Sequence, residues 1–381
     1  MRNVLLVAAE NSAETYAVQI VRECAAGGDF RFWGIGGDRL AACGFENVVH
    51  NRSLAVVGII EVLAHIWRIR GIMKRVFREA RRRRADAALL IDYPDFNLRL
   101  ARRLSRAGIP VYYYISPTVW AWRYGRVAQL RRWVKHLFII FPFEVPIYEK
   151  EGMPFTYTGH PLLSEVRPST SREDFRRRHG VADGDVLLAL LPGSRESEVR
   201  LLLPEIMGAV RRLGGEFRLK VFLQQAQNIS AASLAPSGNG VRVLGQQQGH
   251  DLLNASDVVI TTCGTSNLEA ALLGAPFVAV YRVNRLTYLL GRRFLRIGLY
   301  SIVNILAGRP LAAELIQKEC RAERIYQEAR ALLTDEARRQ EMRREFRRIA
   351  GMLRQDERPA AIICRRLRSD LEGSETKNRD A

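Results

Sequence analysis

The sequence has no apolar run long enough to cross a membrane. A transmembrane helix needs about 18 or more consecutive apolar residues. The apolar run in the N-terminal segment MRNVLLVAAEN is far shorter, and no cleavage-like region follows it. We therefore expect neither a membrane-spanning helix nor a signal peptide, and we expect any contact with a membrane to be peripheral.

Cysteine is also scarce, and its placement follows no familiar pattern. The chain has five cysteines, an odd number, and they are widely spaced. It contains no CxxC pair and no cysteine–histidine cluster with zinc spacing. The sequence therefore predicts a reducing compartment such as the cytoplasm, where disulfides are rare, and no structural metal.

Acidic residues are too few to balance the basic ones. The chain carries 59 Lys and Arg against 40 Asp and Glu, which gives a formal net charge of +19. Such an excess attracts an anionic partner: nucleic acid, an acidic membrane surface or a phosphorylated substrate. Because no DNA- or RNA-reading module is visible, we do not expect nucleic acid to be the partner.

The 381 residues suit two domains rather than one. Short apolar runs, each followed by a polar turn and a helical pattern, recur in both halves, which predicts an α/β fold of two Rossmann-like domains with parallel sheets. We expect an N-terminal domain (1–165), a second domain (166–345), C-terminal helices that pack back on the N-terminal domain or swap in a dimer (346–370), and a disordered tail (371–381). The first expected strand is not followed by GxGxxG, so a nicotinamide cofactor is not indicated.

A candidate phosphate site follows the apolar run at 186–191. This run suits a strand buried on both faces, and Pro192-Gly193 ends it. We expect a helix next, with Ser194 as its N-cap. Unpaired backbone N–H groups at such a turn, together with the Arg195 cation, would hold a diphosphate, whereas the alternative is an ordinary βα turn with a solvated arginine.

A similar turn follows the apolar run at 258–261. It contains Gly264, Thr265 and Ser266, and Glu269 falls in the first turn of the helix expected after it. Glu269 either interacts favourably with the positive end of the helix dipole or accepts hydrogen bonds from ribose hydroxyls.

In the first half, the apolar run at 87–91 ends at Asp92. A carboxylate at the carboxyl end of a parallel strand faces the crevice where open α/β sheets bind ligands, so Asp92 is a candidate general base. The strand expected at 110–115 leads into Trp120 and Trp122. These tryptophans either pack in the core or wall a sugar or acyl pocket.

A basic amphipathic helix is expected between residues 54 and 84. Apolar residues recur there at helical spacing, and lysines and arginines occupy the other positions. With Ile60, Leu63 and Trp67 beside this stripe, the helix could lie on an anionic bilayer. Alternatively, the stripe packs on the sheet and the arginines point into water.

Several longer segments match a known family in order and spacing. They are SLAVVGIIEVL (53–63), IDYPDFNLRLA (91–101), YYISPTVWAWR (113–123), FPFEVPIYEKEGMPFTYTGHPL (141–162), LLPGSRESEV (190–199), GTSNLEAALLGAP (264–276), YRVNRLTYLL (281–290) and VNILAGRPLAAELIQ (303–317). Through them the chain resembles the lipid-A-disaccharide synthases, glycosyltransferases of the GT-B fold, along nearly its whole length.

The resemblance implies an inverting transfer of 2,3-diacylglucosamine from UDP to the 6-hydroxyl of 2,3-diacylglucosamine 1-phosphate (lipid X), without a cofactor or metal. It implies that Asp92 is the base and that Glu10 belongs to the catalytic site. The implied UDP-binding residues are Gly193, Ser194, Arg195, Gly264, Thr265, Ser266, Glu269, Asn304, Gly308 and Arg309. The implied acceptor- and lipid-binding residues are Ser12, Val57, Ile60, Leu63, Trp67, Trp120 and Trp122. A peripheral position on the anionic inner membrane and a monomer or homodimer are also implied.

One segment departs from the family pattern. The family's AGExSGD is AAENSAE at residues 8–14, so two glycines are alanines and the aspartate is Glu14. If the glycines let the backbone approach a phosphate or sugar, the added methyl groups would obstruct it. Two alternatives therefore stay open. One is another UDP-sugar enzyme of this fold, such as the undecaprenyl-linked muramyl transferase or a UDP-GlcNAc epimerase. The other is a catalytically degenerate lipid- or nucleic-acid-binding relative.

Overall fold

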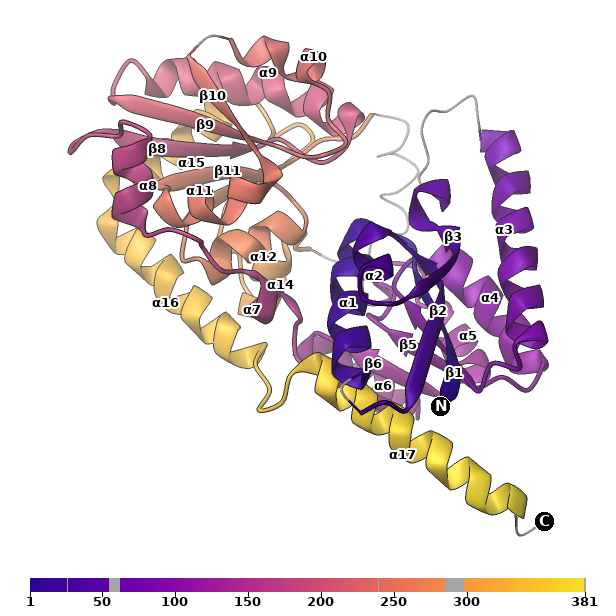
Figure 1. Cartoon of the computed structure of the whole chain (residues 1–381). Coiled ribbons are helices and arrows are strands. Elements are labelled where there is room, and N and C mark those ends of the chain that lie inside the picture. The colour runs from indigo at the N-terminus through magenta and orange to yellow at the C-terminus, as the bar shows by residue number, and fades with distance from the viewer. Residues whose placement is uncertain (26, 55–61, 239, 285–297, 380–381) are drawn as a thin grey trace. The chain divides into compact units, whose positions relative to one another are not determined.

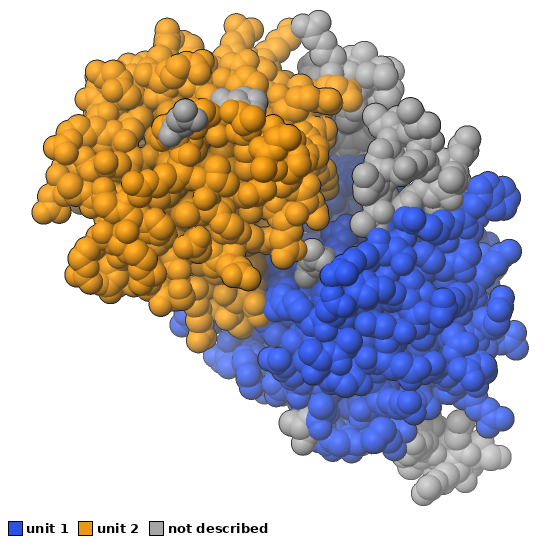
Figure 2. Space-filling model, turned by 45° about the horizontal axis from the view of Figure 1, so that its top comes forward, with its two compact units in different colours: residues 1–161, 353–381 blue, residues 162–352 orange. Residues whose placement is uncertain are grey.

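The computed structural model describes residues 1–25, 27–54, 62–238, 240–284 and 298–379. The chain divides into two compact units, shown in blue and orange in Figure 2: residues 1–161 with 353–381 (unit 1) and residues 162–352 (unit 2). Each unit is built on a parallel sheet, which confirms the predicted fold class. The boundaries between the units lie after Pro161 and after Met352, whereas the sequence predicted boundaries after residues 165 and 345.

Unit 1 contains a seven-stranded sheet in the order β3-β2-β1-β4-β5-β6-β7. Its strands are β1 (Arg2–Ala8), β2 (Phe30–Gly36), β3 (Glu46–His50), β4 (Ala87–Ile91), β5 (Val111–Tyr114), β6 (His136–Ile139) and β7 (Phe155–Tyr157). The central strand β4 is apolar and buried throughout, as expected for a strand with helices on both faces of its sheet. The edge strands β3 and β7 are only partly buried, and the sequence did not predict them.

Helices cover both faces of the unit 1 sheet (Figure 1). They are α1 (Asn11–Ala25), α2 (Asp38–Ala41), α3 (Val62–Arg82), α4 (Pro94–Arg106), α5 (Arg126–Trp133), α6 (Val145–Lys150) and α17 (Pro359–Arg379). One buried cluster joins the sheet to α3, α4 and α5, and a second joins it to α1 and α17. In β1, Leu5 faces the first cluster and Leu6 the second, which is the alternation that a strand imposes.

Helix α3 is the expected amphipathic helix. Met73, Val76 and Ala80 are buried against the sheet, while Lys74 and Arg78 are exposed. Within the described residues, no helix combines the length and the apolar character that crossing a bilayer requires.

The last helix, α17, returns to unit 1 and packs along α1 (Figure 1). Ile363, Leu367 and Leu371 belong to the same buried cluster as α1. Cys364 forms a disulfide with Cys24 of α1, which the expectation of a reducing compartment had argued against. The helix is described to Arg379, whereas the polar composition predicted a disordered tail from residue 371.

Unit 2 contains a six-stranded sheet in the order β10-β9-β8-β11-β12-β13. Its strands are β8 (Val186–Leu191), β9 (Leu219–Gln225), β10 (Val241–Gly245), β11 (Val258–Thr262), β12 (Phe277–Tyr281) and β13 (Glu314–Ile316). Its helices are α7 (Leu162–Glu165), α8 (Arg172–Arg178), α9 (Glu196–Leu213), α10 (Ala231–Leu234), α11 (Gly249–Ala255), α12 (Thr265–Leu272), α14 (Ile302–Ala307), α15 (Ala322–Thr334) and α16 (Glu336–Met352).

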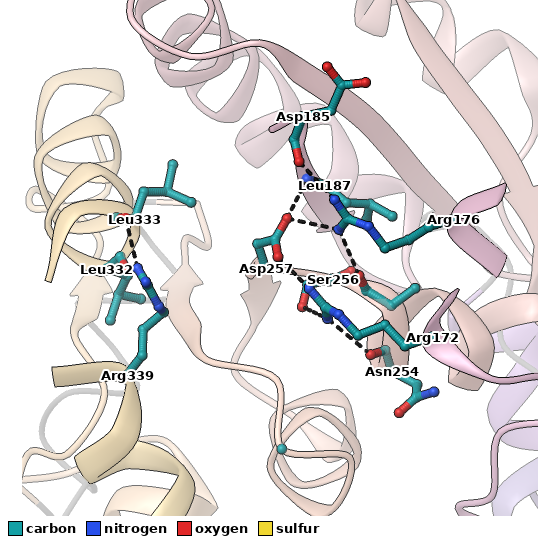
Figure 3. A network of polar contacts seen from close by, with 12 residues as sticks. Arg172, Arg176, Asp185, Leu187, Asn254, Ser256, Asp257, Leu332, Leu333 and Arg339 are labelled. Carbon is teal, nitrogen blue, oxygen red and sulfur yellow. Dashed lines mark hydrogen bonds and ion pairs between the residues drawn. The ribbon is translucent and has the colours of Figure 1, made fainter. Parts of the chain in front are cut away.

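Two arginines of α8 fix the amino-terminal edge of the unit 2 sheet (Figure 3). Arg172 and Arg176 both pair with Asp257, the residue before β11. Asp257 in turn accepts the backbone N–H of Leu187 in β8 at 2.7 Å. Arg172 also donates to the carbonyl of Ser256 at 2.9 Å. This network ties β8 to β11, so the turns at the opposite ends of these strands start from fixed positions.

Candidate functional site

Loops of unit 1 that carry polar side chains meet at the carboxyl edge of its sheet. Strands β1, β4, β5 and β6 are neighbours and parallel, so they end on the same side. The loops that follow them carry Glu10, Asp92, Ser116 and Glu144. This is the edge at which open α/β sheets bind ligands.

Asp92 has an unusual backbone conformation. Its φ is +48° and that of Tyr93 is +46°, in the left-handed region that costs a non-glycine residue about 1–2 kcal/mol. The Nδ2 group of Asn97 donates to the carbonyls of Ile91 and Asp92 at 3.1 and 2.7 Å. The hydroxyl of Tyr113 donates to the Asp92 carbonyl at 2.6 Å. These bonds hold a strained turn at the tip of β4, a feature that recurs at active sites.

The carboxyl group of Asp92 is more basic than an ordinary aspartate. Burial is the largest cause and the charge of Glu10 adds to it, which raises the pKa of Asp92 to about 6 against an opposing bond from the backbone of Tyr93. At neutral pH Asp92 is therefore ionised but close to its pKa, as a general base requires. Glu10 is exposed and acts on Asp92 through its charge. Ser12 is also exposed, in the first turn of α1.

The altered segment at residues 8–14 does not obstruct this edge. The side chains of Ala9 and Ala13, which stand where the family has glycine, are buried in the two apolar clusters on opposite faces of the sheet. Glu14 is buried as well, and its carboxylate accepts the backbone N–H of Leu40 at 3.0 Å and Nδ2 of Asn51 at 3.1 Å. The departure from the family pattern is thus absorbed by packing inside unit 1.

The sequence did not indicate a buried carboxyl group at Glu144. It accepts the backbone N–H of Phe141 at 3.2 Å and a hydrogen bond from Ser116. The hydroxyls of Ser116 and Tyr148 are hydrogen bonded to each other. Burial raises the pKa of Glu144 to about 8. At neutral pH Glu144 is therefore mainly a neutral acid, and it connects the loops that follow β5 and β6.

The two predicted pocket tryptophans are half-buried in the loop after β5. Trp120 packs edge-on against Phe143, with 5.1 Å between the ring centroids. Trp122 donates from Nε1 to the hydroxyl of Thr118 at 2.8 Å. Both rings are partly exposed, and neither belongs to the two buried clusters described for unit 1.

The predicted lipid-binding residues near α3 are only partly described. Val57 and Ile60 lie outside the described residues, and for Leu63 the structure describes the helix but not the side chain. Trp67 is 70% exposed, and the guanidinium of Arg70 lies 5.4 Å from the centroid of its ring.

In unit 2, the turn after β8 is shaped around Glu198. Gly193 has φ +125°, and a Cβ atom there would lie 2.7 Å from Oε2 of Glu198, so glycine is required. The N-cap of α9 is Arg195, so the prediction of Ser194 as the cap is wrong. The backbone N–H of Ser194 instead donates to Oε2 of Glu198 at 3.3 Å, and Arg195 pairs with Oε1 at 2.9 Å. The side chain of Arg195 is 74% exposed and keeps further N–H groups for an anion.

The turn after β11 lies next to it, because β8 and β11 are paired. Gly264 is the N-cap of α12, and its N–H donates to Oδ1 of Asn267 at 3.0 Å. Thr265 is exposed at the start of the helix, and Ser266 accepts the hydroxyl of Thr261 at 2.8 Å. The two predicted phosphate turns are therefore adjacent at one edge of the unit 2 sheet.

Glu269 lies one helical turn further along α12. Burial raises its pKa, and the charge of His250, at the start of α11, opposes that shift. A shielded carboxyl group beside these turns suits hydrogen bonding to ribose hydroxyls.

Asn304 lies inside unit 2 rather than on its surface. Its Nδ2 donates to Oε1 of Glu314 at 2.7 Å and to the carbonyl of Ala312 at 2.8 Å, and its Oδ1 accepts the N–H of Ala312. The side chain is fully buried, so it positions the 308–314 loop and is not available to close a pocket directly. Gly308 ends α14 with φ +71°, and Arg309 is exposed and pairs with Glu341 at 2.8 Å.

Two Rossmann-like units with polar turns at the carboxyl ends of their parallel sheets define a protein of the GT-B glycosyltransferase fold. The chain is similar to MurG of Acinetobacter baumannii (TM-score 0.55, 17% identity, 97% of this chain and 100% of that one). It is also similar to the calicheamicin glycosyltransferase CalG4 (TM-score 0.62, 16% identity, 98% of each chain). At these identities the likeness establishes the fold alone.

Sequence comparison identifies the family. The family model of lipid-A-disaccharide synthetase matches residues 4–363. The lipid-A-disaccharide synthase of Myxococcus xanthus is 40% identical over 355 residues, 92% of this chain and 93% of the relative. That of Koribacter versatilis is 35% identical over 382 residues, 99% of this chain and 100% of the relative. The chain belongs to the lipid-A-disaccharide synthetase family.

Proposed function

We propose that this chain transfers 2,3-diacylglucosamine from UDP to the 6-hydroxyl of lipid X, which yields the β-1′,6-linked disaccharide 1-phosphate and UDP. The observation that carries this proposal is the 40% identity to a lipid-A-disaccharide synthase over 92% of the chain. The polar edges of the two units supply groups that such a transfer needs.

The donor binds at the carboxyl edge of the unit 2 sheet. The adjacent turns at Gly193 and Gly264 bring helix N-termini to one place, and Arg195 adds an exposed guanidinium beside them. Thr265 and Ser266 offer hydroxyls at the second turn. Fixed donors of this kind stabilise the charge that develops on the departing UDP.

Further groups of unit 2 complete the donor site. Glu269 accepts hydrogen bonds from the ribose hydroxyls, since burial has made its carboxyl group a better proton acceptor. Gly308 and Arg309 lie at the exposed end of α14 and complete the donor site, while Asn304 holds their loop from inside.

The acceptor binds at the carboxyl edge of the unit 1 sheet, where Asp92 takes the proton from its 6-hydroxyl. The hydroxyl oxygen attacks the anomeric carbon from the face opposite UDP, so the configuration inverts. Two features support Asp92 as the base: its pKa, raised to about 6 by burial and by Glu10, and the hydrogen bonds that fix its backbone. Ser12, Trp120 and Trp122 line the acceptor side.

Helix α3 places unit 1 on the cytoplasmic surface of the inner membrane. Trp67 is exposed near its start, and Lys74, Arg78, Arg81 and Arg82 line an open hollow of about 560 Å³ towards its end. An exposed indole beside a row of cations is what an interfacial helix presents to anionic lipid. Vesicle flotation tests this arrangement: binding should require anionic lipid, weaken with salt and fall in Trp67→Ala.

Mass spectrometry of the products from UDP-2,3-diacylglucosamine and lipid X tests the proposed reaction. We expect an acylated disaccharide 1-phosphate together with UDP. The same assay with non-acylated UDP-glucosamine separates this function from that of other UDP-sugar enzymes of the GT-B fold. Turnover of the non-acylated sugar alone, or salt-sensitive DNA binding without any transfer, would contradict the proposal.

A further inference from the structure

A hollow of about 380 Å³ lies in unit 1 between the N-terminal ends of α4 and α5. Its lining includes Pro94, Asp95, Arg99, Arg123 and Arg126. The first of these residues follows Asp92 by two positions, so the hollow adjoins the strained turn at the tip of β4. Both helices point their N-termini, the positive ends of their dipoles, towards it.

The charges of this hollow do not balance. Its lining carries three guanidinium groups and one carboxylate, Asp95. The side chain of Arg126 is 7% exposed and bonds to Asp95 at 2.6 Å, and Arg123 reaches the same oxygen at 3.2 Å. Arg99 is exposed and has no ion pair within the described residues. An excess of two positive charges remains, which matches a phosphate monoester in its dianionic form.

The arginines are held in place before any ligand arrives. The guanidinium of Arg123 lies 4.4 Å from the centroid of the Trp122 ring, and that of Arg126 lies 5.2 Å from it. Trp122 is itself fixed by its bond to Thr118. Stacked guanidinium groups lose less freedom on binding, and their planar forks fit phosphate oxygens in pairs.

We propose that this hollow binds the phosphate monoester of the acceptor sugar and so distinguishes the acceptor from the donor. The inference rests on the proposed function, in which both substrates carry the same diacylated glucosamine and differ in what is attached to the anomeric carbon. Asp92 and Asp95 are three residues apart, so their Cα atoms are at most about 11 Å from each other. This bound allows a single hexosamine to place its 6-hydroxyl at Asp92 and its phosphate in the hollow.

Acceptor selectivity in neutral detergent micelles tests the proposal. The substrates are lipid X and the same sugar without its phosphate, and the variants are Arg99→Gln and Arg123→Gln. Loss of one charge-assisted contact should lower kcat/KM for lipid X by about tenfold in each variant and change kcat/KM for the dephosphorylated sugar by less than about twofold. The KM for the UDP-sugar should not change. Arg106→Gln, at the other end of α4, is the matched control and should keep wild-type selectivity.

Three results would overturn the proposal. Wild-type selectivity in both pocket variants, or an equal loss with both acceptors, would exclude recognition of the phosphate. An effect that appears only with anionic vesicles, and not in neutral micelles, would assign the arginines to lipid headgroups. Calorimetric titration with lipid X and with its dephosphorylated form distinguishes a failure of the phosphate site from a failure of the proposed function. Tighter binding of lipid X without disaccharide formation would support the phosphate site and reject the reaction.

Discussion

Replacing Asn97 by alanine should both destabilise unit 1 and displace the base. Asn97 is fully buried, and its Nδ2 serves the carbonyls of Ile91 and Asp92. Leaving a buried acceptor without a partner costs about 1–3 kcal/mol. In the variant, the Asp92 carbonyl keeps its hydrogen bond from Tyr113. Oδ1 of Asn97 is buried without a partner in the described part of the chain, so removing this atom offsets part of the loss of stability. We therefore expect a loss of about 1–2 kcal/mol.

The effect on catalysis should be larger than the effect on stability. Without Nδ2, the left-handed turn can relax, and a shift of the base by about 1 Å can lower the rate about 100-fold. Urea unfolding measures the first effect, and kcat for disaccharide formation measures the second. Asn3→Ala is the matched control, because Nδ2 of Asn3 also donates to a backbone carbonyl, that of Arg83, beyond the opposite end of the sheet. An Asn97→Ala protein with wild-type kcat would refute the view that this side chain positions Asp92.

Three further outcomes are expected. Glu10→Gln removes a negative charge that raises the pKa of Asp92, so the acid limb of the kcat/KM profile should move below its wild-type position near pH 6; an unmoved limb would exclude this coupling. In Glu144, a pKa near 8 in the folded state and near 4.5 in the unfolded state makes the wild type lose stability as pH rises between these values. Glu144→Gln should therefore match the wild type in urea unfolding near pH 4.5 and exceed it at pH 8, and the reverse order would contradict the assignment. Reducing the disulfide between Cys24 and Cys364 should lower the stability of unit 1 by about 2–4 kcal/mol. Cys24→Ser should lower it by the same amount, and dithiothreitol should not change the stability of that variant further.

The strands at the centre of each sheet could be predicted from the sequence. The apolar runs at 87–91 and 186–191 match β4 and β8 residue for residue, because a strand buried on both faces leaves an uninterrupted apolar run. The edge strands β3, β7 and β13 were missed, since partial burial removes that signal. In β2, Gly34 lies within the strand, where a Cβ atom would approach the carbonyl of Leu6 to 2.2 Å.

The candidate site was predictable only where position along a strand determines it. Asp92 could be found because it ends an apolar run. The groups that hold it, Asn97 and Tyr113, act through bonds to backbone carbonyls, and no spacing in the sequence reveals such bonds. The same reason explains why Asn304 was assigned to the pocket although its bonds are internal to unit 2. Ser194 was assigned as a cap because the sequence does not show that Glu198 folds back onto the turn.

Disaccharide formation by the Asp92→Asn protein tests the central claim most directly. Asparagine keeps the size of the side chain and removes its ability to accept a proton, so the rate should fall by about 100-fold or more while UDP binding to unit 2 stays at the wild-type level. Asp86→Asn, which changes the residue just before β4 at the opposite end of the same strand, is the control and should keep the wild-type rate. An unaltered rate in Asp92→Asn would remove Asp92 from the mechanism and contradict the account.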